Sequence, residues 1–455
     1  MLELDNIKQV YLIGIGGIGM SGLARYFNHL GCIVCGYDKT STPLTDTLEH
    51  EGIQVIFEDE SDLIPEVFTK PDDATLIIYT PAIPKNSVVL NFFSHAGFEL
   101  HKRSQVLGII SKGMFTVAVA GTHGKTTTSS LIAHLLTEGG KSCSAFLGGI
   151  ATNFESNVVY GNSDIVVVEA DEYDRSFLTL YPDIAIITSM DADHLDIYGD
   201  HEQLADSFRS FASQIKSGGK LIAKQGLPLQ HQFTSYTIGA EAADALGHNI
   251  RVENGSFYFD FTNGNVDIKD IQLGLPGLHN IENAVAAIQV ALLMDVDADV
   301  IKSALASFKG VKRRFEYVVK NNRNVYIDDY AHHPEELKAC INSVKKLYPD
   351  YKLTAIFQPH LYTRTRDFAD GFAEALDMVD ELLMLDIYPA RELPIAGVDA
   401  STILDKMQLP QKQLLGRAEV VAYVKQQQPR LLLTVGAGDI DQLIESLKQA
   451  LEHVA

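Results

Sequence analysis

The chain has 455 residues, of which 46% are hydrophobic and 21% charged, and its formal net charge is -22. This length exceeds what one hydrophobic core can organise, so we expect several folded domains. The negative charge argues against a nucleic-acid or anionic-membrane surface, because both need a basic patch. The N-terminus has no basic segment followed by an apolar one, and no apolar run could span a bilayer, which predicts a soluble protein of the cytoplasm.

The first hundred residues alternate apolar runs with helical patterns. Apolar segments lie at 10–17, 32–38 and 74–84, with a helical pattern at 21–31, which is the rhythm of a parallel sheet with crossover helices. A G-x-G-x-x-G loop at Gly14, Gly16 and Gly19 precedes Asp38. This pattern predicts a pyrophosphate bound to backbone amides, without identifying the nucleotide, and a nicotinamide cofactor is the default interpretation.

A second glycine-rich loop, AGTHGKT at 120–126, joins an expected strand at 115–121 to an expected helix. Such a loop points backbone N–H groups at one spot, its lysine (Lys125) reaches the β- and γ-phosphates, and the hydroxyl of Thr126 can hold Mg²⁺. Val119 stands where the general pattern has its first glycine. We expect an ATP site, which weakens the nicotinamide interpretation. Lys125 should be an exposed loop residue, so that its replacement by alanine abolishes turnover and spares the fold.

Acidic side chains follow the next two expected strands. The run 165–168 ends in Glu169, Ala170, Asp171 and Glu172, and the run beginning at 183 ends in DADHLD at 191–196. Carboxylates at this edge of a parallel sheet lie where the Mg²⁺ of a phosphate loop would sit. Glu169 is the better ligand candidate, and His194 could serve a second metal.

The remaining chain adds an antiparallel patch and a third strand-helix unit. Residues 250–275 show period-2 alternation with two Asn-Gly pairs, the strongest short hairpin signal, and should lie at the edge of the second unit. An amphipathic helix at 274–293 and a basic boundary segment at 308–316 follow. Three α/β domains fit this order.

Six segments of the chain resemble the Mur ligases of peptidoglycan synthesis in order and spacing: AGTHGKTTT, VVVEADEYD, DADHLD, LPGLHNIENA, GVKRRFE and DDYAHHP. The resemblance covers essentially the whole chain. It implies a Rossmann-like N-terminal domain (1–106) that binds a UDP-sugar, a central P-loop ATPase domain with a parallel sheet (107–312), and a Rossmann-like C-terminal domain (313–455) that binds an amino acid. GIGGIGMSGLA, FQPHLYTRTRDF and DIYPARE most resemble the members that join L-alanine to UDP-N-acetylmuramate with ATP and Mg²⁺.

The resemblance also implies roles for individual residues. The first glycine loop would hold UDP rather than a dinucleotide, through Gly14, Gly16, Gly17, Gly19 and Asp38. ATP would be bound by Gly121, Thr122, Gly124, Lys125, Thr126, Thr127, His279, Asn280 and Asn283. The metal ligands would be Thr126, Glu169 and His194, and the catalytic residues Lys125, Glu169, His194, Arg314 and Asp329. The amino-acid pocket would include Tyr330, His332 and Arg364.

One position departs from the family pattern. Leu361 stands where the family often has an arginine near the incoming amino acid. Arg364 is therefore our first candidate for binding the L-alanine carboxylate, since a planar guanidinium matches a carboxylate. Arg366 should instead pair with a neighbouring acid.

The implied reaction converts a carboxylate into an acyl phosphate that the amine attacks, and it needs no protein nucleophile. Three alternatives stay open. A family member that reattaches a recovered peptide to UDP-N-acetylmuramate would differ mainly in the C-terminal pocket. An NAD-dependent oxidoreductase would bind NADH, and a nucleotide switch would hydrolyse ATP or GTP without a carboxylate substrate.

Overall fold

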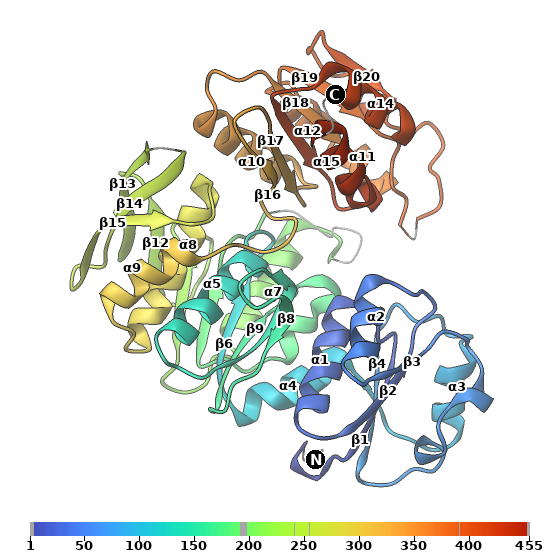
Figure 1. Cartoon of the computed structure of the whole chain (residues 1–455). Helices are drawn as coiled ribbons and strands as arrows, with labels where there is room; N and C mark the ends of the chain where they lie inside the picture. Colours follow the sequence, from blue (N-terminus) through green and yellow to red (C-terminus); the bar gives the residue numbers. More distant parts are fainter. Residues whose placement is uncertain (1–3, 192–197, 241, 254, 391, 453–455) are drawn as a thin grey trace. The chain divides into compact units, whose positions relative to one another are not determined.

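The computed structural model describes residues 4–191, 198–240, 242–253, 255–390 and 392–452. Within these ranges the strands form three sheets of five, ten and six strands, flanked by helices (Figure 1). The predicted α/β class is confirmed. The boundaries at residues 106/107 and 312/313 stay a prediction. By close packing the chain divides into two compact units, one of residues 1–248, 261–269 and 282–308, the other of residues 249–260, 270–281 and 309–455.

The first sheet is wholly parallel, in the order β3-β2-β1-β4-β5. Side chains of the middle strand alternate between two apolar layers, with Val10 and Leu12 in one cluster and Tyr11 and Ile13 in another. Because β2 and β4 lie on opposite sides of β1, the loop after β1 opens at a topological switch point, where such sheets bind ligands. The elements are β1 (Gln9–Ile13), α1 (Ile18–His29), β2 (Ile33–Tyr37), α2 (Pro43–His50), β3 (Gln54–Ile56), β4 (Thr75–Tyr79), α3 (Val88–His95), β5 (Leu100–Lys102) and α4 (Arg103–Gly113).

The central sheet has the order β15-β14-β13-β12-β11-β10-β6-β9-β7-β8. β6 lies between β10 and β9, parallel to both, with Ala120 opposite Ile187 and Val119 opposite Glu169. The loop after β6 therefore shares an edge with the ends of β9 and β10. The first elements are β6 (Phe115–Ala120), α5 (Lys125–Glu138), β7 (Ser144–Ala151), β8 (Ser156–Val159), β9 (Ile165–Glu169), β10 (Ile184–Ile187), α7 (His201–Ala212), β11 (Lys220–Lys224) and β12 (Thr234–Ile238).

Three consecutive strands extend the central sheet at one end: β13 (Ala245–Glu253), β14 (Ser256–Thr262) and β15 (Asp267–Leu273). Residues 254–255 and 263–266 are the only connections between them, too short for parallel crossovers, so the strands run antiparallel. The predicted antiparallel patch is confirmed as part of this sheet. Two helices follow, α8 (Leu278–Leu293) and α9 (Ala298–Ser307).

The third sheet has the order β16-β17-β21-β18-β19-β20, and all its neighbours are parallel except β16 and β17. The loops after β17, β18, β19 and β21 therefore emerge at one edge of the sheet. The elements are β16 (Glu316–Lys320), β17 (Val325–Asp329), α10 (Pro334–Leu347), β18 (Leu353–Phe357), α11 (Tyr362–Asp367), α12 (Ala369–Leu376), β19 (Glu381–Met384), α13 (Ser401–Leu404), β20 (Lys412–Leu414), α14 (Arg417–Gln427), β21 (Leu431–Val435) and α15 (Ile444–Glu452).

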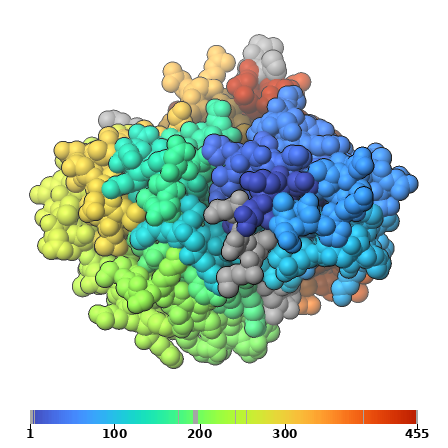
Figure 2. Space-filling model, turned by 90° about the horizontal axis from the view of Figure 1, so that it is seen from below, coloured from blue at the N-terminus to red at the C-terminus, as the bar shows by residue number. Residues whose placement is uncertain are grey.

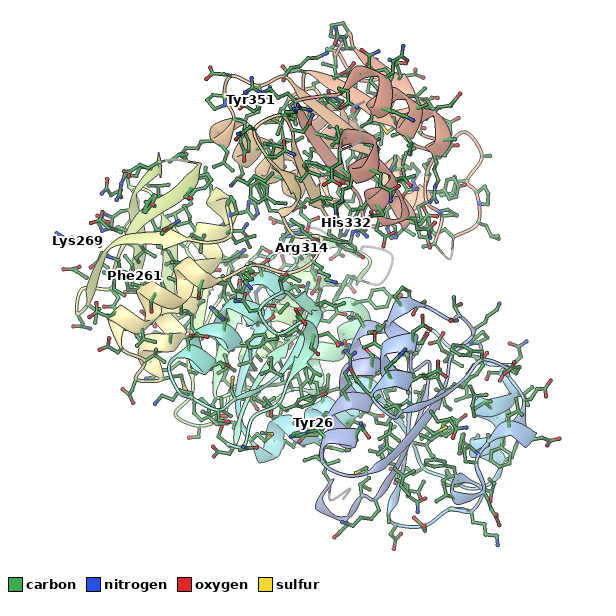
Figure 3. All side chains as sticks on the ribbon, in the orientation of Figure 1. Tyr26, Phe261, Lys269, Arg314, His332 and Tyr351 are labelled. Atoms are coloured by element: carbon green, nitrogen blue, oxygen red, sulfur yellow. The ribbon has the colours of Figure 1, made fainter. Side chains whose placement is uncertain are left out.

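Helix α1 of the first sheet is fastened to the β7–β8 hairpin of the central sheet, and both belong to the first compact unit. Asn157 of β8 is 1% exposed. Its amide donates to the Ile18 carbonyl at 2.5 Å and accepts from Arg25 at 2.6 Å. The ring of Tyr26, which is labelled in Figure 3, packs 5.2 Å from that of Phe146. Both residues belong to the first compact unit, whose N-terminal part is blue in Figure 2. The helix that begins at the first glycine loop is thus held by the central domain.

None of the helices in the described ranges combines the length and apolar character needed to cross a bilayer.

Candidate active site

The phosphate loop runs from the end of β6 into α5, and its glycines are required by backbone shape and by space. Gly121 has φ +137° and Gly124 has φ +81°, values that other residues rarely adopt. A Cβ on Gly121 would lie 2.8 Å from the Ser189 nitrogen, and one on Gly124 would lie 2.6 Å from Oδ1 of Asn283. Asn283, implied to bind ATP, therefore lies directly against the loop.

Hydroxyl groups that follow β10 hold the phosphate loop in place. The hydroxyls of Ser189 and Thr122 lie 2.9 Å apart, and Ser189 Oγ accepts from the His123 N–H at 2.7 Å. The Thr188 hydroxyl donates to the carbonyls of Ala120 and His123. Thr188 and Ser189 were not singled out from the sequence, because the expected strand that begins at 183 ran through them, whereas β10 ends at Ile187. Thr127, in the first turn of α5, is buried.

Lys125 is largely shielded from solvent at the first position of α5, and the expectation of an exposed loop residue is wrong. Its side chain is 13% exposed, and its Nζ donates to Oε2 of Glu172 at 2.6 Å and to the Gly121 carbonyl at 2.7 Å. Burial lowers the pKa of Lys125, but the charges of Glu172, Asp171 and Glu169 outweigh it, and the net pKa is raised. Lys125 therefore stays cationic. Glu172 was noted in the acidic run but given no role, and its side chain is only 1% exposed.

Glu169 ends β9 beside the phosphate loop. Its Oε1 accepts from the Thr126 hydroxyl at 3.1 Å and its Oε2 from the Gly148 N–H at 2.8 Å. A side chain at position 148 would collide with the Glu169 carboxylate, so glycine leaves it room. Burial raises the pKa of Glu169, which the nearby Lys125 charge opposes. The structure thus brings together two of the three expected metal ligands.

Oxygen donors of this kind suit Mg²⁺, which commonly uses one or two carboxylates and takes further ligands from phosphates and water. Asp171 and Glu172 add negative charge around Lys125, and Arg103 lines the same pocket as Glu169 and Asp171. The third expected ligand, His194, lies outside the described residues. Among those that are described, no three His, Cys, Asp or Glu side chains converge as a metal site. The Thr126 and Glu169 oxygens fit a metal that is completed by phosphate oxygens.

The first glycine loop is closed by the acid that sequence analysis paired with it. Oδ2 of Asp38 accepts from the Gly16 N–H at 2.8 Å, and Gly14 has φ +90°. Gly17 caps the N-terminus of α1. Side-chain space at Gly19, in the first turn of α1, is taken by the guanidinium of Arg103. The four glycines expected to bind the UDP-sugar therefore lie between the end of β1 and the first turn of α1, and Asp38, which follows β2, is bonded to this loop.

A second group of expected residues surrounds the end of β17, in the second compact unit. The Asp329 carboxylate accepts from the N–H groups of Phe315 at 2.8 Å and Ala331 at 2.7 Å. Burial raises its pKa to about 6. The Arg314 guanidinium lies 4.9 Å from the centre of the Tyr330 ring. These bonds fix the loop that carries the implied catalytic and amino-acid residues.

Glu336 links Arg314 to His332. Its carboxylate lies 4.0 Å from the Arg314 guanidinium and 3.4 Å from Nδ1 of His332, and it accepts from the His332 N–H at 3.0 Å. Figure 3 shows Arg314 and His332 close together. Glu336 was not among the expected site residues.

His279 and Asn280 begin helix α8 in the same compact unit as Arg314. Burial, opposed by the Glu336 charge and aided by the smaller effect of Arg314, lowers the pKa of His279 to about 4. The ring is therefore neutral at physiological pH. The Asn280 amide donates to the Pro276 carbonyl at 2.6 Å, so this side chain also shapes the turn before α8.

The two arginines of helix α11 differ sharply in solvent exposure. Arg364 is 7% exposed, whereas the Arg366 side chain is 51% exposed and lies 2.6 Å from the Asp367 carboxylate. The expectation that Arg366 pairs with a neighbouring acid is confirmed. Leu361, at the N-terminus of this helix, has φ +69° and ψ +139°, an unusual conformation for a residue with a side chain.

Comparison with known proteins relates each part of the chain to one family. Residues 9–114 match the description "Mur ligase family, catalytic domain", residues 119–291 "Mur ligase middle domain", and residues 313–440 "Mur ligase, glutamate ligase domain". The UDP-N-acetylmuramate–L-alanine ligase of Flavobacterium psychrophilum is 48% identical over 453 residues, which are 99% of this chain and 100% of that protein. The ligase of the same name from Parabacteroides distasonis is 49% identical over 456 residues, 99% of this chain and 98% of that protein.

A solved structure agrees with these sequence matches. The crystal structure of UDP-N-acetylmuramate-alanine ligase MurC from Thermotoga maritima has a TM-score of 0.79 at 26% identity and covers 98% of each chain. A murein peptide ligase from Psychrobacter arcticus has a TM-score of 0.69 at 23% identity, covering 98% of this chain and 99% of that one. At that identity the likeness shows a shared fold alone.

Proposed function

This chain belongs to the Mur ligase family, and we propose that it joins the carboxylate of UDP-N-acetylmuramate to the amino group of L-alanine while converting ATP to ADP and phosphate. The observation that carries this proposal is the 48% identity, over the full length of both chains, to a ligase named for that reaction. A cytoplasmic location accompanies the proposal, because the reaction consumes ATP.

The reaction needs activation because a carboxylate has no usable leaving group. Transfer of the γ-phosphoryl group of ATP to a carboxylate oxygen gives an acyl phosphate and ADP. The uncharged amine of L-alanine then attacks the carbonyl carbon, and inorganic phosphate leaves as the amide forms. Positioning and charge stabilisation account for such chemistry without a protein nucleophile.

We assign ATP to the phosphate-loop residues Gly121, Thr122, Gly124, Lys125, Thr126 and Thr127. Backbone N–H groups at the start of α5 would bind phosphate oxygens, and Lys125 would offset phosphoryl charge. Three carboxylates raise the pKa of Lys125, which supports a permanently cationic role. Thr126 and Glu169, 3.1 Å apart, would hold Mg²⁺, and His194 remains a proposed ligand. When bound, Mg²⁺ supplies positive charge near the transferring phosphoryl group. His279, Asn280 and Asn283 are proposed to contact the nucleotide.

The other two substrates are assigned to the outer domains. Gly14, Gly16, Gly17, Gly19 and Asp38 would bind UDP-N-acetylmuramate, which the switch-point position of their loop supports. Arg314 and Asp329 are proposed to act on ATP. Tyr330, His332 and Arg364 are proposed to line the L-alanine pocket, and the burial of Arg364 supports a guanidinium held for one carboxylate.

Phosphate release from ATP tests the proposed function. The protein would be incubated with UDP-N-acetylmuramate and Mg²⁺, and with L-alanine, glycine, L-serine, D-alanine or the tripeptide L-alanyl-γ-D-glutamyl-meso-diaminopimelate. We expect release that requires both the UDP-sugar and an amino acid, with L-alanine preferred. A preference for the tripeptide would instead identify a recycling ligase. Release without the UDP-sugar would indicate a nucleotide switch.

A further inference from the structure

The segment DIYPARE (residues 386–392) has no role in the assignments above, yet its last residue reaches helix α11. Oε2 of Glu392 accepts from the Thr363 N–H at 3.0 Å, and its Oε1 accepts from the Thr363 hydroxyl. Both carboxylate oxygens are therefore engaged by one residue in the first turn of the helix that carries Arg364.

Helix α11 needs such support because its own sequence provides little. It has six residues, and its N-cap residue Leu361 accepts no side-chain hydrogen bond. The first N–H groups of any helix lack partners within the helix, and a helix of this length is not stable alone. A carboxylate at this end also interacts favourably with the helix dipole. Leu361 has no side-chain hydrogen-bond acceptor for these N–H groups. Glu392 supplies one from another segment of the chain.

The same loop also fixes where α11 begins. The Leu361 N–H donates to the Tyr388 carbonyl at 2.9 Å, and the Tyr388 N–H donates to the Pro359 carbonyl at 2.8 Å. These two bonds hold the chain before the helix, and Glu392 holds its first turn. Tyr388 and Glu392 thus make contacts on both sides of the unusual backbone at Leu361.

Arg364 directly follows Thr363, so the start of α11 determines where its guanidinium lies. Removal of the Glu392 contacts would free the first turn to shift, and a displacement of about 1 Å is enough to impair recognition of a small ligand. The exposed Arg366 has its own partner in Asp367, and the charge of Glu392 adds a smaller effect that also raises the pKa of Arg366.

We propose that Glu392 is a positioning residue for L-alanine, acting through Thr363 and helix α11 on Arg364. This inference rests on the proposed function, since it concerns the amino-acid pocket of that reaction. Glu392 itself contacts no substrate. It connects two segments, FQPHLYTRTRDF and DIYPARE, that are far apart in sequence.

The test compares Glu392→Ala with Glu419→Ala. Glu419 is a matched control because it accepts from the Gly416 N–H at 2.7 Å at the start of α14, in the same sheet domain. Both variants lose an N-terminal helix contact and should have similarly lowered melting temperatures. Glu392→Ala alone should raise the KM for L-alanine about tenfold, the scale of losing charge-assisted hydrogen bonds, with the KM values for ATP and UDP-N-acetylmuramate unchanged.

Thr363 variants keep the inference testable should Glu392→Ala fail to fold. Thr363→Val removes the hydroxyl and retains the N–H, so it should raise the KM for L-alanine by a smaller factor, whereas Thr363→Ser should restore the wild-type value. Equal increases in all three KM values, or an unchanged KM for L-alanine in Glu392→Ala and Thr363→Val, would overturn the positioning role. Wild-type protein that lacks L-alanine-dependent phosphate release would overturn the proposed function instead.

Discussion

The buried pair of Lys125 and Glu172 predicts that Lys125→Ala costs stability as well as activity. The side chains are 13% and 1% exposed, and the charged atoms lie 2.6 Å apart. The variant removes the cation, and the Glu172 carboxylate stays buried without the charge of Lys125. Removing one member of a buried ion pair is strongly unfavourable, so loss of ligation in Lys125→Ala has two causes that must be separated.

The size of the effect follows from this geometry. At 2.6 Å and an effective dielectric constant of about 20, the attraction between two unit charges is roughly 6 kcal/mol, before the cost of removing both from water. Breaking such a pair by removing one partner typically costs about 3–5 kcal/mol. A domain of the size of the central one loses roughly 2–4 °C per kcal/mol, so the melting temperature should fall by roughly 6–20 °C.

Thermal unfolding and phosphate release, measured on the same preparations, separate the two causes. The double variant Lys125→Ala/Glu172→Ala removes both charges and should recover most of the lost melting temperature, because no charge remains buried alone. It should remain inactive, because no cation offsets the phosphoryl charge. If Lys125→Ala melted like the wild type, or the double variant were less stable than the single one, the reasoning from the buried pair would be refuted.

Three further predictions concern other residues of the site. Asp38→Ala should weaken binding of UDP-N-acetylmuramate and leave ATP binding unchanged in calorimetry, whereas equal losses would mean that the ligands are assigned to the wrong domains. Arg364→Lys should raise the KM for L-alanine much more than the KM values for ATP and UDP-N-acetylmuramate, because the charge remains but the planar fork is lost; Arg366→Lys is the control, and an alanine-specific effect there would show that we chose the wrong arginine. Because burial raises the pKa of Asp329 to about 6, above about 3.9 in the unfolded chain, the stability it contributes is fully present below pH 3.9 and lost as the pH rises through 6. Asp329→Asn should remove roughly 3 kcal/mol of this pH dependence, measured by urea unfolding, and identical profiles for the two proteins would contradict the raised pKa.

The site residues that could be predicted from the sequence are those that belong to local sequence patterns. Lys125 follows a strand and a glycine-rich turn, and Glu169 ends the next expected strand, so each position follows from its neighbours in the chain. The positions of Glu172 and Ser189 do not follow from the neighbouring sequence. Glu172 lies only three residues beyond Glu169 in the same acidic run, and the backbone turn after β9 alone decides that it meets Lys125. Ser189 reaches the phosphate loop because β10 lies beside β6, and no local pattern fixes that strand order.

The C-terminal domain gives a similar division. Arg364 and Arg366 are two positions apart, so they cannot lie on the same side of a helix, and one was expected to be structural. The adjacent Asp367 identified which one. Glu392, by contrast, reaches Thr363 from a loop 29 positions away. Only the parallel pairing of β18 and β19 brings these segments to one edge of the sheet. The residue spacing within each segment does not predict this pairing.

The hydroxyls of Thr188 and Ser189 have a consequence for nucleotide affinity. They fix the backbone of the phosphate loop through the protein's own hydrogen bonds. Ordering a free residue opposes binding by roughly 1–2 kcal/mol, and a loop already ordered by folding does not subtract that amount when a phosphate arrives. The affinity for ATP is therefore coupled to the stability of the β6–β10 edge. Ser189, to which no contact with the nucleotide is assigned, would influence ATP binding through the rigidity of its neighbours.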